Sequence, residues 1–157
     1  MNDVVPPTQA IFQAMQDVLS SINSAFEAEG VVLPDRQYVM IGEAAHDCEQ
    51  LTVSFDQLFL GGPGDEITTP LRCEAARTIA LSVQLVRCVP AITRQGPPTA
   101  EQLTETTERL TQDSWLLLEG CINSIPANYL GALVDVTVTA PDGKFQAVQA
   151  NLTVGVP

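Results

Sequence analysis

Two runs of alternating polar and apolar residues, joined by a loop rich in glycine and proline, constrain the fold of this chain most. The runs cover residues 48–60 and 78–88. Their apolar positions are Leu51, Val53 and Phe55 in the first and Ile79, Leu81, Val83 and Leu85 in the second. A period of two over this length is typical of half-buried strands in an antiparallel sheet, apolar face inward and polar face outward. The alternation shifts near Leu58-Phe59-Leu60, which predicts a bulge or a partner-facing apolar end.

Amphipathic helices are predicted on both sides of this strand pair. The first is expected over residues 8–29, followed by Gly30, a residue that readily ends a helix. The second is expected to begin at the capping box Thr99-Ala100-Glu101-Gln102 and to end near Ser124. Its inner face is predicted to consist of Leu103, Thr107, Leu110, Ser114, Leu117, Leu118, Cys121 and Ile122. Trp115 falls at the edge of that stripe, where an indole can be half buried with its N–H toward a partner.

Three further strands complete the predicted fold. Residues 37–42 form a short apolar strand, and residues 133–140 and 145–156 form a terminal hairpin around Pro141-Asp142-Gly143-Lys144. The element order is therefore α-β-β-β-α-β-β. Because 157 residues is the length of about one domain, we expect a single domain over the whole chain. The fold class is α+β, mainly an antiparallel sheet with two amphipathic helices packed on it.

The charge of the chain is strongly acidic. It has 19 acidic and 7 basic residues, a formal net charge of −12. Such a surface repels DNA, because DNA binding depends on Lys and Arg displacing counterions from phosphates. Solubility is one interpretation of the charge, and keeping DNA from adhering where DNA must pass is the other. No apolar run approaches the roughly 20 residues that cross a bilayer, and the first residues do not resemble a signal peptide. We expect a soluble protein made in the cytosol, with no membrane partner.

The four cysteines, at positions 48, 73, 88 and 121, do not have the close spacing of a zinc or redox site. Because no secretion signal is seen, four free buried thiols are expected rather than two disulfides. His46 and Cys48 share a strand face, yet nothing nearby would lower the pKa of the thiol. The start of an ordinary strand is therefore favoured over a nucleophile.

The remaining sequence also lacks a pattern typical of catalysis. The acidic residues are spread over helix faces and loops, whereas metal or glycosidase chemistry needs inward-facing pairs. Gly61-Gly62-Pro63-Gly64 is followed neither by Lys-Ser/Thr nor by a helix, so it is no phosphate cradle. We therefore expect no enzyme, no cofactor and no metal.

The loop from Gly61 to Pro70 is longer than the roughly two to five residues usual for a hairpin. Long loops that interrupt a good hairpin are often functional, and a mobile surface loop is the alternative. Its first part consists of Gly61, Gly62, Pro63, Gly64, Asp65 and Glu66. We treat these residues as a candidate functional element.

The order of these elements in a chain of this length resembles the tail terminator proteins of long-tailed phages. The resemblance is sharpest from Cys48-Glu49-Gln50-Leu51-Thr52-Val53 through Leu71-Arg72-Cys73 to Val86-Arg87-Cys88-Val89-Pro90. The chain is similar in this respect to head-to-tail connector proteins of actinobacterial siphophages. The match is one of pattern and overall length, and it spans most of the chain.

The resemblance implies a structural virion protein without catalytic residues or cofactors. Such proteins form a homohexameric ring that caps the tail tube, ends tail polymerisation and joins the tail to the head connector. The implied partners are copies of the chain itself, the major tail tube protein, and a head–tail stopper or connector protein. DNA would pass through the lumen without specific binding. The implied location is the tail or neck of the virion, after synthesis in the host cytoplasm.

Two segments are candidate contact surfaces in such a ring. Residues 61–66 are expected to face the lumen or a partner. The terminal strand is expected to dock on a neighbouring subunit through Leu152, Val154 and Val156. Exposed strand edges offer a further contact, by adding strand to strand between subunits.

Three alternatives remain at this point. The chain could be another neck or tail part, namely a stopper, an adaptor or a tail-tube subunit. It could be an intracellular binding module with an unknown partner. From a different class, it could be a small Cys-dependent hydrolase using Cys48 and His46. A tube subunit is expected to polymerise by itself, whereas a terminator stops at one ring.

Overall fold

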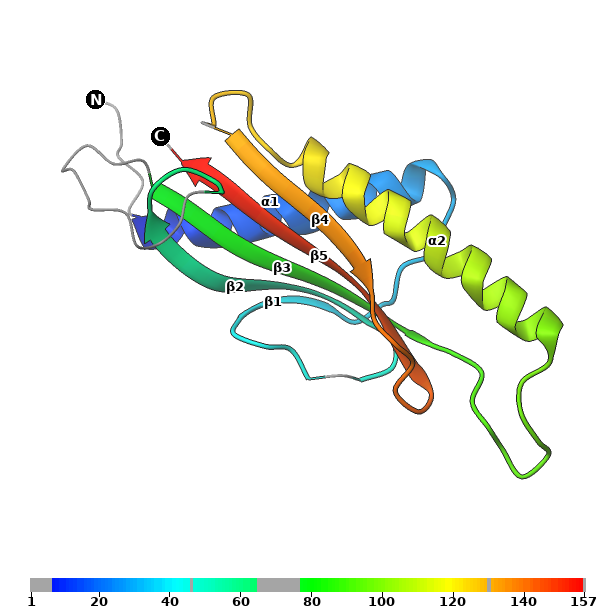
Figure 1. Ribbon diagram of the computed structural model, residues 1–157. Helices are drawn as coiled ribbons and strands as arrows, with labels where there is room; N and C mark the ends of the chain where they lie inside the picture. The colour runs from blue at the N-terminus through cyan, green and yellow to red at the C-terminus, as the bar shows by residue number, and fades with distance from the viewer. Residues whose placement is uncertain (1–6, 46, 65–76, 130, 157) are drawn as a thin grey trace.

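A computed structural model describes residues 7–45, 47–64, 77–129 and 131–156 of the chain. Figure 1 shows a twisted sheet with both helices on one of its faces. The elements, in chain order, are α1 (Pro7–Ala28), β1 (Gln37–Ile41), β2 (Gln50–Leu60), β3 (Arg77–Cys88), α2 (Ala100–Asn123), β4 (Gly131–Val138) and β5 (Phe145–Val156). The predicted α+β class and the order α-β-β-β-α-β-β are confirmed.

The sheet has five strands in the order β1-β2-β3-β5-β4. β2 and β3 pair antiparallel, as the alternating runs predict, and β5 lies between β3 and β4. β1 is the exception, because it runs parallel to β2 at one edge. The register of β2 on β3 shifts between Phe55 and Gln57, so the predicted bulge is real but lies at Asp56 rather than at residues 58–60.

The core lies between the sheet and the helices and is aliphatic. Its strand residues are Leu51 and Val53 of β2, Ile79, Leu81, Val83 and Leu85 of β3, and Ala150, Leu152 and Val154 of β5. Its helix residues are Met15, Val18, Ile22 and Phe26 of α1 and Leu116, Leu117 and Cys121 of α2. Burial of this apolar area is the main force that holds the helices on the sheet.

The end of α1 and the start of α2 are capped as their sequences predict. Gly30 has a φ of 67°, and the N–H of Val31 donates to the carbonyl of Phe26 at 2.9 Å, a pattern that closes the last turn of α1. At the start of α2, Thr99 accepts from the N–H of Gln102 and the Gln102 side chain accepts from Thr99. Neither helix is long and apolar enough to cross a membrane.

The outer face of the sheet differs from the prediction. Thr52 and Ser54 point away from the helices as expected, yet both are buried. The connection between β1 and β2 folds back over this face (Figure 1), with Ala44 buried and the carbonyl of Ala45 accepting from the Gln50 side chain. The polar face is therefore covered near β2 and open toward β4.

Candidate functional site

The candidate loop is described from Gly61 to Gly64, and Asp65 and Glu66 lie outside the described residues. The carbonyl of Gly61 accepts a hydrogen bond from the Thr78 hydroxyl. Gly64 has a φ of 88°, and a Cβ built on it would lie 3.3 Å from Cδ1 of Leu133 on β4. The first half of the loop therefore packs across the end of the sheet, instead of projecting freely from the hairpin.

The predicted contact strand needs a correction. Leu152 and Val154 are only 1% and 5% exposed, because β5 lies inside the sheet and directs these side chains toward the helices. They belong to the core and are not available to a neighbouring subunit. The side chain of Val156 lies outside the described residues. The edge strand next to β5 is β4, whose Leu133 and Val138 are exposed to solvent.

The open part of the outer face carries polar side chains that bind one another. The Asn151 amide donates to the Asp135 carboxylate at 2.9 Å, and the Gln149 amide donates to Asn151 at 3.1 Å. Ser82 donates to Asp56 across β3 and β2. A shallow hollow beside them is lined by Gly42, Glu43, Ala44, Ser54, Asp56, Ser82, Gln84 and Gln149. This face offers hydrogen bonds and negative charge, which suits recognition of a polar partner.

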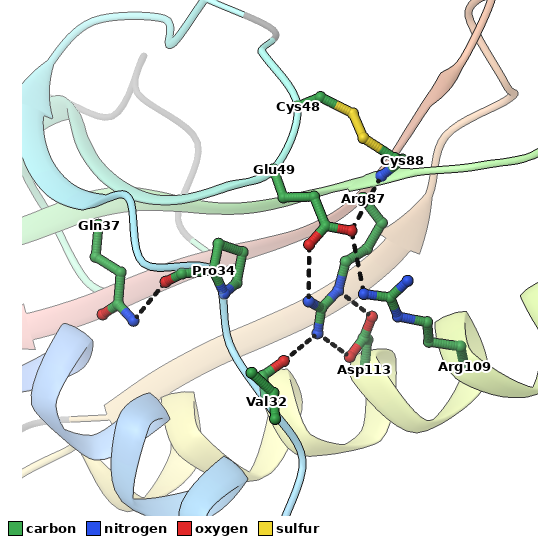
Figure 2. Close-up of polar contacts among 9 residues, drawn as sticks. All are labelled: Val32, Pro34, Gln37, Cys48, Glu49, Arg87, Cys88, Arg109 and Asp113. Atoms are coloured by element: carbon green, nitrogen blue, oxygen red, sulfur yellow. Dashed lines mark hydrogen bonds and ion pairs between the residues drawn. A yellow bond between two sulfur atoms is a disulfide. The ribbon is translucent and has the colours of Figure 1, made fainter.

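A buried ion pair lies at the end of the sheet that is opposite to the loop at residues 61–64 (Figure 2). The guanidinium of Arg87, on β3, binds the carboxylate of Asp113, on α2, through two contacts of 2.9 Å each. Both side chains are almost fully buried. Arg87 also donates to the carbonyl of Val32 at 3.1 Å. The Glu49 carboxylate lies 3.8 Å from the Arg87 guanidinium and 3.1 Å from the Arg109 guanidinium. The cluster connects β3 and α2 with the segments that precede β1 and β2.

Sequence reasoning missed this cluster because the inner helix face was taken to be apolar. The available signal was Asp113 itself, three positions after Leu110 and four before Leu117 on the core-facing stripe. A charge at such a position needs a partner, since an unpaired buried charge is very costly. Every charged group of the cluster has a partner within the described chain, so the arrangement connects the elements that carry these side chains.

The cysteine prediction is corrected in one respect. Cys48 and Cys88 form a disulfide, with their Cα atoms 5.6 Å apart at the adjoining ends of β2 and β3 (Figure 2). In this form Cys48 has no free thiol for the hydrolase considered above, and His46 lies outside the described residues. Cys121 is a free buried thiol as predicted, and burial raises its pKa to about 12. Cys73 lies outside the described residues.

The predicted inner face of α2 is also partly wrong. Leu110, Leu117 and Cys121 are buried, but Leu103 and Ile122 are about half exposed. The helix is rotated so that Asp113, Leu116 and Gly120 also face inward. A Cβ on Gly120 would lie 2.8 Å from the Cα of Ile22, so α1 and α2 touch backbone to backbone there. The rotation leaves Trp115 more exposed than the half-buried indole that was expected.

No group of three or more His, Cys, Asp or Glu side chains in the described part of the chain is placed to hold a metal. Comparison with protein-family models and with curated proteins finds no match to this chain. The function must therefore be inferred from the surfaces themselves. These are the open polar face, the two edge strands, the packed loop at residues 61–64, and the exposed surface of α2.

Proposed function

We propose that this chain is a structural virion protein of a long-tailed phage. Its copies would form a homohexameric ring that caps the tail tube, ends tail polymerisation, and joins the tail to a head–tail stopper or connector protein. The observation that supports this most is the placement of both helices on one face of the sheet (Figure 1). The part of the other face toward β4 and the outer edges of β1 and β4 remain for neighbours.

The two edges differ, as ring formation requires. β1 has five residues and runs parallel to its neighbour, whereas β4 has eight and runs antiparallel. A closed ring needs two different surfaces on each subunit, which meet head to tail. Unpaired backbone N–H and C=O groups along an edge strand are a template for such a contact.

The acidic charge supports a lumen through which DNA slides. The chain carries a net charge of −12, and three of its arginines are already paired with carboxylates. Those arginines are Arg36, Arg87 and Arg109. Because phosphate binding depends on free cationic groups, little of this surface attracts DNA.

The disulfide favours a virion protein over a purely intracellular binding module. Disulfides persist in oxidising surroundings, including virion surfaces, and are rare in the reducing cytosol. A phage protein is made in the reducing cytosol of the host cell and is then released, as part of the particle, into oxidising surroundings. Cys48 and Cys88 would then bond after release, at a site where the β2–β3 register already brings them together.

Negative-stain microscopy tests the proposal directly. The purified protein is imaged alone and after mixing with tubes assembled from the major tail protein of the same phage, and its mass is measured by light scattering. A terminator is expected to place one discrete cap on each tube end and to stop further growth. In the capped state, six copies of the 16.8 kDa chain give about 101 kDa. Long tubes made by the protein alone would identify a tail-tube subunit instead. Tube ends that stay bare and keep growing would overturn the proposal.

A further inference from the structure

Trp115 occupies an unusual position on the surface of α2. It is the single tryptophan of the chain, and the residue is 68% exposed. Glu29, Glu108 and Glu119 line the same shallow hollow, which lies between the end of α1 and the outer side of α2. Exposed tryptophan is rare outside contact surfaces, where it is among the residues that contribute most to binding. The hollow therefore has the features of a binding surface.

The charge around the indole is not compensated within the described chain. The ion pairs there engage the carboxylates of Asp47, Glu49 and Asp113, and none engages the three glutamates beside Trp115. A cation stacked on the indole face would be attracted both by the ring and by these carboxylates. Ile122, two helical turns further along the same face, is also exposed and extends the surface with an apolar contact. The occupant that fits is a guanidinium next to an aliphatic side chain.

The chain presents such a segment on the connection between β3 and α2. We name residues 92–96 the finger. Thr93 and Gly96 exchange two backbone hydrogen bonds of 3.1 and 3.0 Å, and the Thr93 hydroxyl accepts from the N–H of Gln95. Arg94 is exposed at the tip and has no carboxylate partner within the described residues, and Ile92 is 81% exposed. The finger is a tight, hydrogen-bonded turn, which lowers the entropy lost on docking.

The finger and the hollow of one copy cannot meet. Figure 1 shows the β3–α2 connection extending past the end of the sheet and away from the body of α2. Trp115 lies 16 positions beyond Thr99, or about 24 Å along the helix axis. A contact between these two surfaces therefore joins different copies.

We infer that the finger of each copy docks in the Trp115 hollow of the next copy. Arg94 stacks on the indole between the glutamates, and Ile92 contacts the apolar surface toward Ile122. Finger and hollow are different surfaces, so the contact is head to tail and can close into a ring. The inference rests on the proposed function in that it names one subunit contact of that ring. A cationic segment of another virion protein is the competing occupant.

The single tryptophan allows the contact to be observed in the full-length protein. Sedimentation velocity over a range of concentrations reports assembly, and tryptophan emission reports burial of the indole. Wild-type protein is expected to associate, with emission moving to shorter wavelength as the oligomer forms. Arg94→Glu and Glu119→Arg are each expected to raise the dissociation constant at least tenfold. The double variant, which reverses the pair, is expected to restore most of the association.

Matched controls separate this contact from general charge effects. Lys144→Glu reverses an exposed cation on another turn, and Glu105→Arg reverses an exposed carboxylate of α2 outside the hollow. Both are expected to associate like wild type. Association that is unaffected by Arg94→Glu and Glu119→Arg, or that the double variant fails to restore, would overturn the inference. A protein that stays monomeric at every concentration would also overturn the inference. The same holds for a tryptophan emission shift that appears only when tail tubes are added and that persists in Arg94→Glu.

The outcomes distinguish this inference from the proposed function. Caps on tube ends that form equally well with Arg94→Glu would retain the terminator and exclude the finger contact. Association that depends on the reversed pair, with tube ends left bare, would retain the finger contact and exclude the terminator.

Discussion

The two faces of the sheet are built from alternate residues of the same strands, yet they are filled in opposite ways. Toward the helices, β3 contributes Ile79, Leu81, Val83 and Leu85 to a closed aliphatic core. Away from them it contributes Ala80, Ser82 and Gln84, and polar side chains on this face bind one another. The face toward the helices thus contributes most of the free energy of folding, while the part of the other face toward β4 is open to solvent.

This difference predicts where the molecule tolerates change. A substitution on the helix side must preserve volume and charge pairing, because packed interiors do not adapt easily. A substitution on the open face leaves groups that water can still solvate. The variants below test this contrast, from the largest expected loss of stability to the smallest.

The largest loss is expected from breaking the buried ion pair. Asp113→Asn leaves the buried Arg87 guanidinium with only the more distant Glu49 carboxylate, 3.8 Å away, and should cost about 3–5 kcal/mol in the free energy of unfolding. Urea denaturation followed by circular dichroism measures it. Replacing both partners, Arg87→Met with Asp113→Leu, should recover most of the loss, because no buried charge then remains.

An exposed pair provides the matched control. Arg36 and Asp47 are 2.6 Å apart, with 55% and 59% of their side chains exposed. Arg36→Ala should cost no more than about 1 kcal/mol, since solvent already screens that pair. Equal losses for the two pairs would contradict the contrast between buried and exposed charge.

The next effect is expected from the disulfide. Cys48 and Cys88 are separated by 40 positions, and removing a bond that closes a loop of this size should cost about 2–4 kcal/mol. The free energy of unfolding of wild type should therefore fall in the presence of a reductant. The double variant Cys48→Ser with Cys88→Ser should match reduced wild type and should not respond to the reductant. A wild-type protein insensitive to reduction would show that the bond adds nothing to stability.

A smaller loss is expected where the helices touch. Gly120→Ala places a methyl group 2.8 Å from the backbone of Ile22, which forces α1 and α2 apart. Overpacking of this kind costs about 1–3 kcal/mol, more than alanine gains from its helix propensity. Thr111→Ala, on the exposed side of the same helix, should be neutral or slightly stabilising, and thermal unfolding compares the two.

Local patterns were sufficient to predict most of the fold. Alternation over 48–60 and 78–88 predicts β2 and β3, and the capping box at Thr99 predicts the start of α2, because these signals lie within a few neighbouring residues. Strand order was not predictable in this way. It depends on pairing between distant segments, so the place of β5 inside the sheet, and hence the burial of Leu152 and Val154, was missed.

The disulfide and the ion pair also join distant segments, but each left a trace in the sequence. Cys48 and Cys88 lie at the outer ends of two strands predicted to pair, so the hairpin already brings them together. Asp113 falls on a core-facing stripe, which calls for a cation such as Arg87. The solvent exposure of Trp115 also left a signal, because its neighbours at helical spacing, Thr111, Gln112 and Glu119, are polar.

The smallest effect on stability is expected on the open face. Asp135 lies on β4, exposed, and accepts from Asn151 at 2.9 Å. Asp135→Ala should change the free energy of unfolding by no more than about 0.5 kcal/mol, because water replaces the lost contact. If this face meets a neighbour, the same variant should nevertheless weaken capping of tail tubes, since an interface loses the bond without solvent to replace it. Thr137→Ala, also exposed on β4, is the control for a change of shape alone. A loss of stability similar to that of Gly120→Ala would mean that both faces of the sheet contribute to folding, and that the contrast between them is wrong.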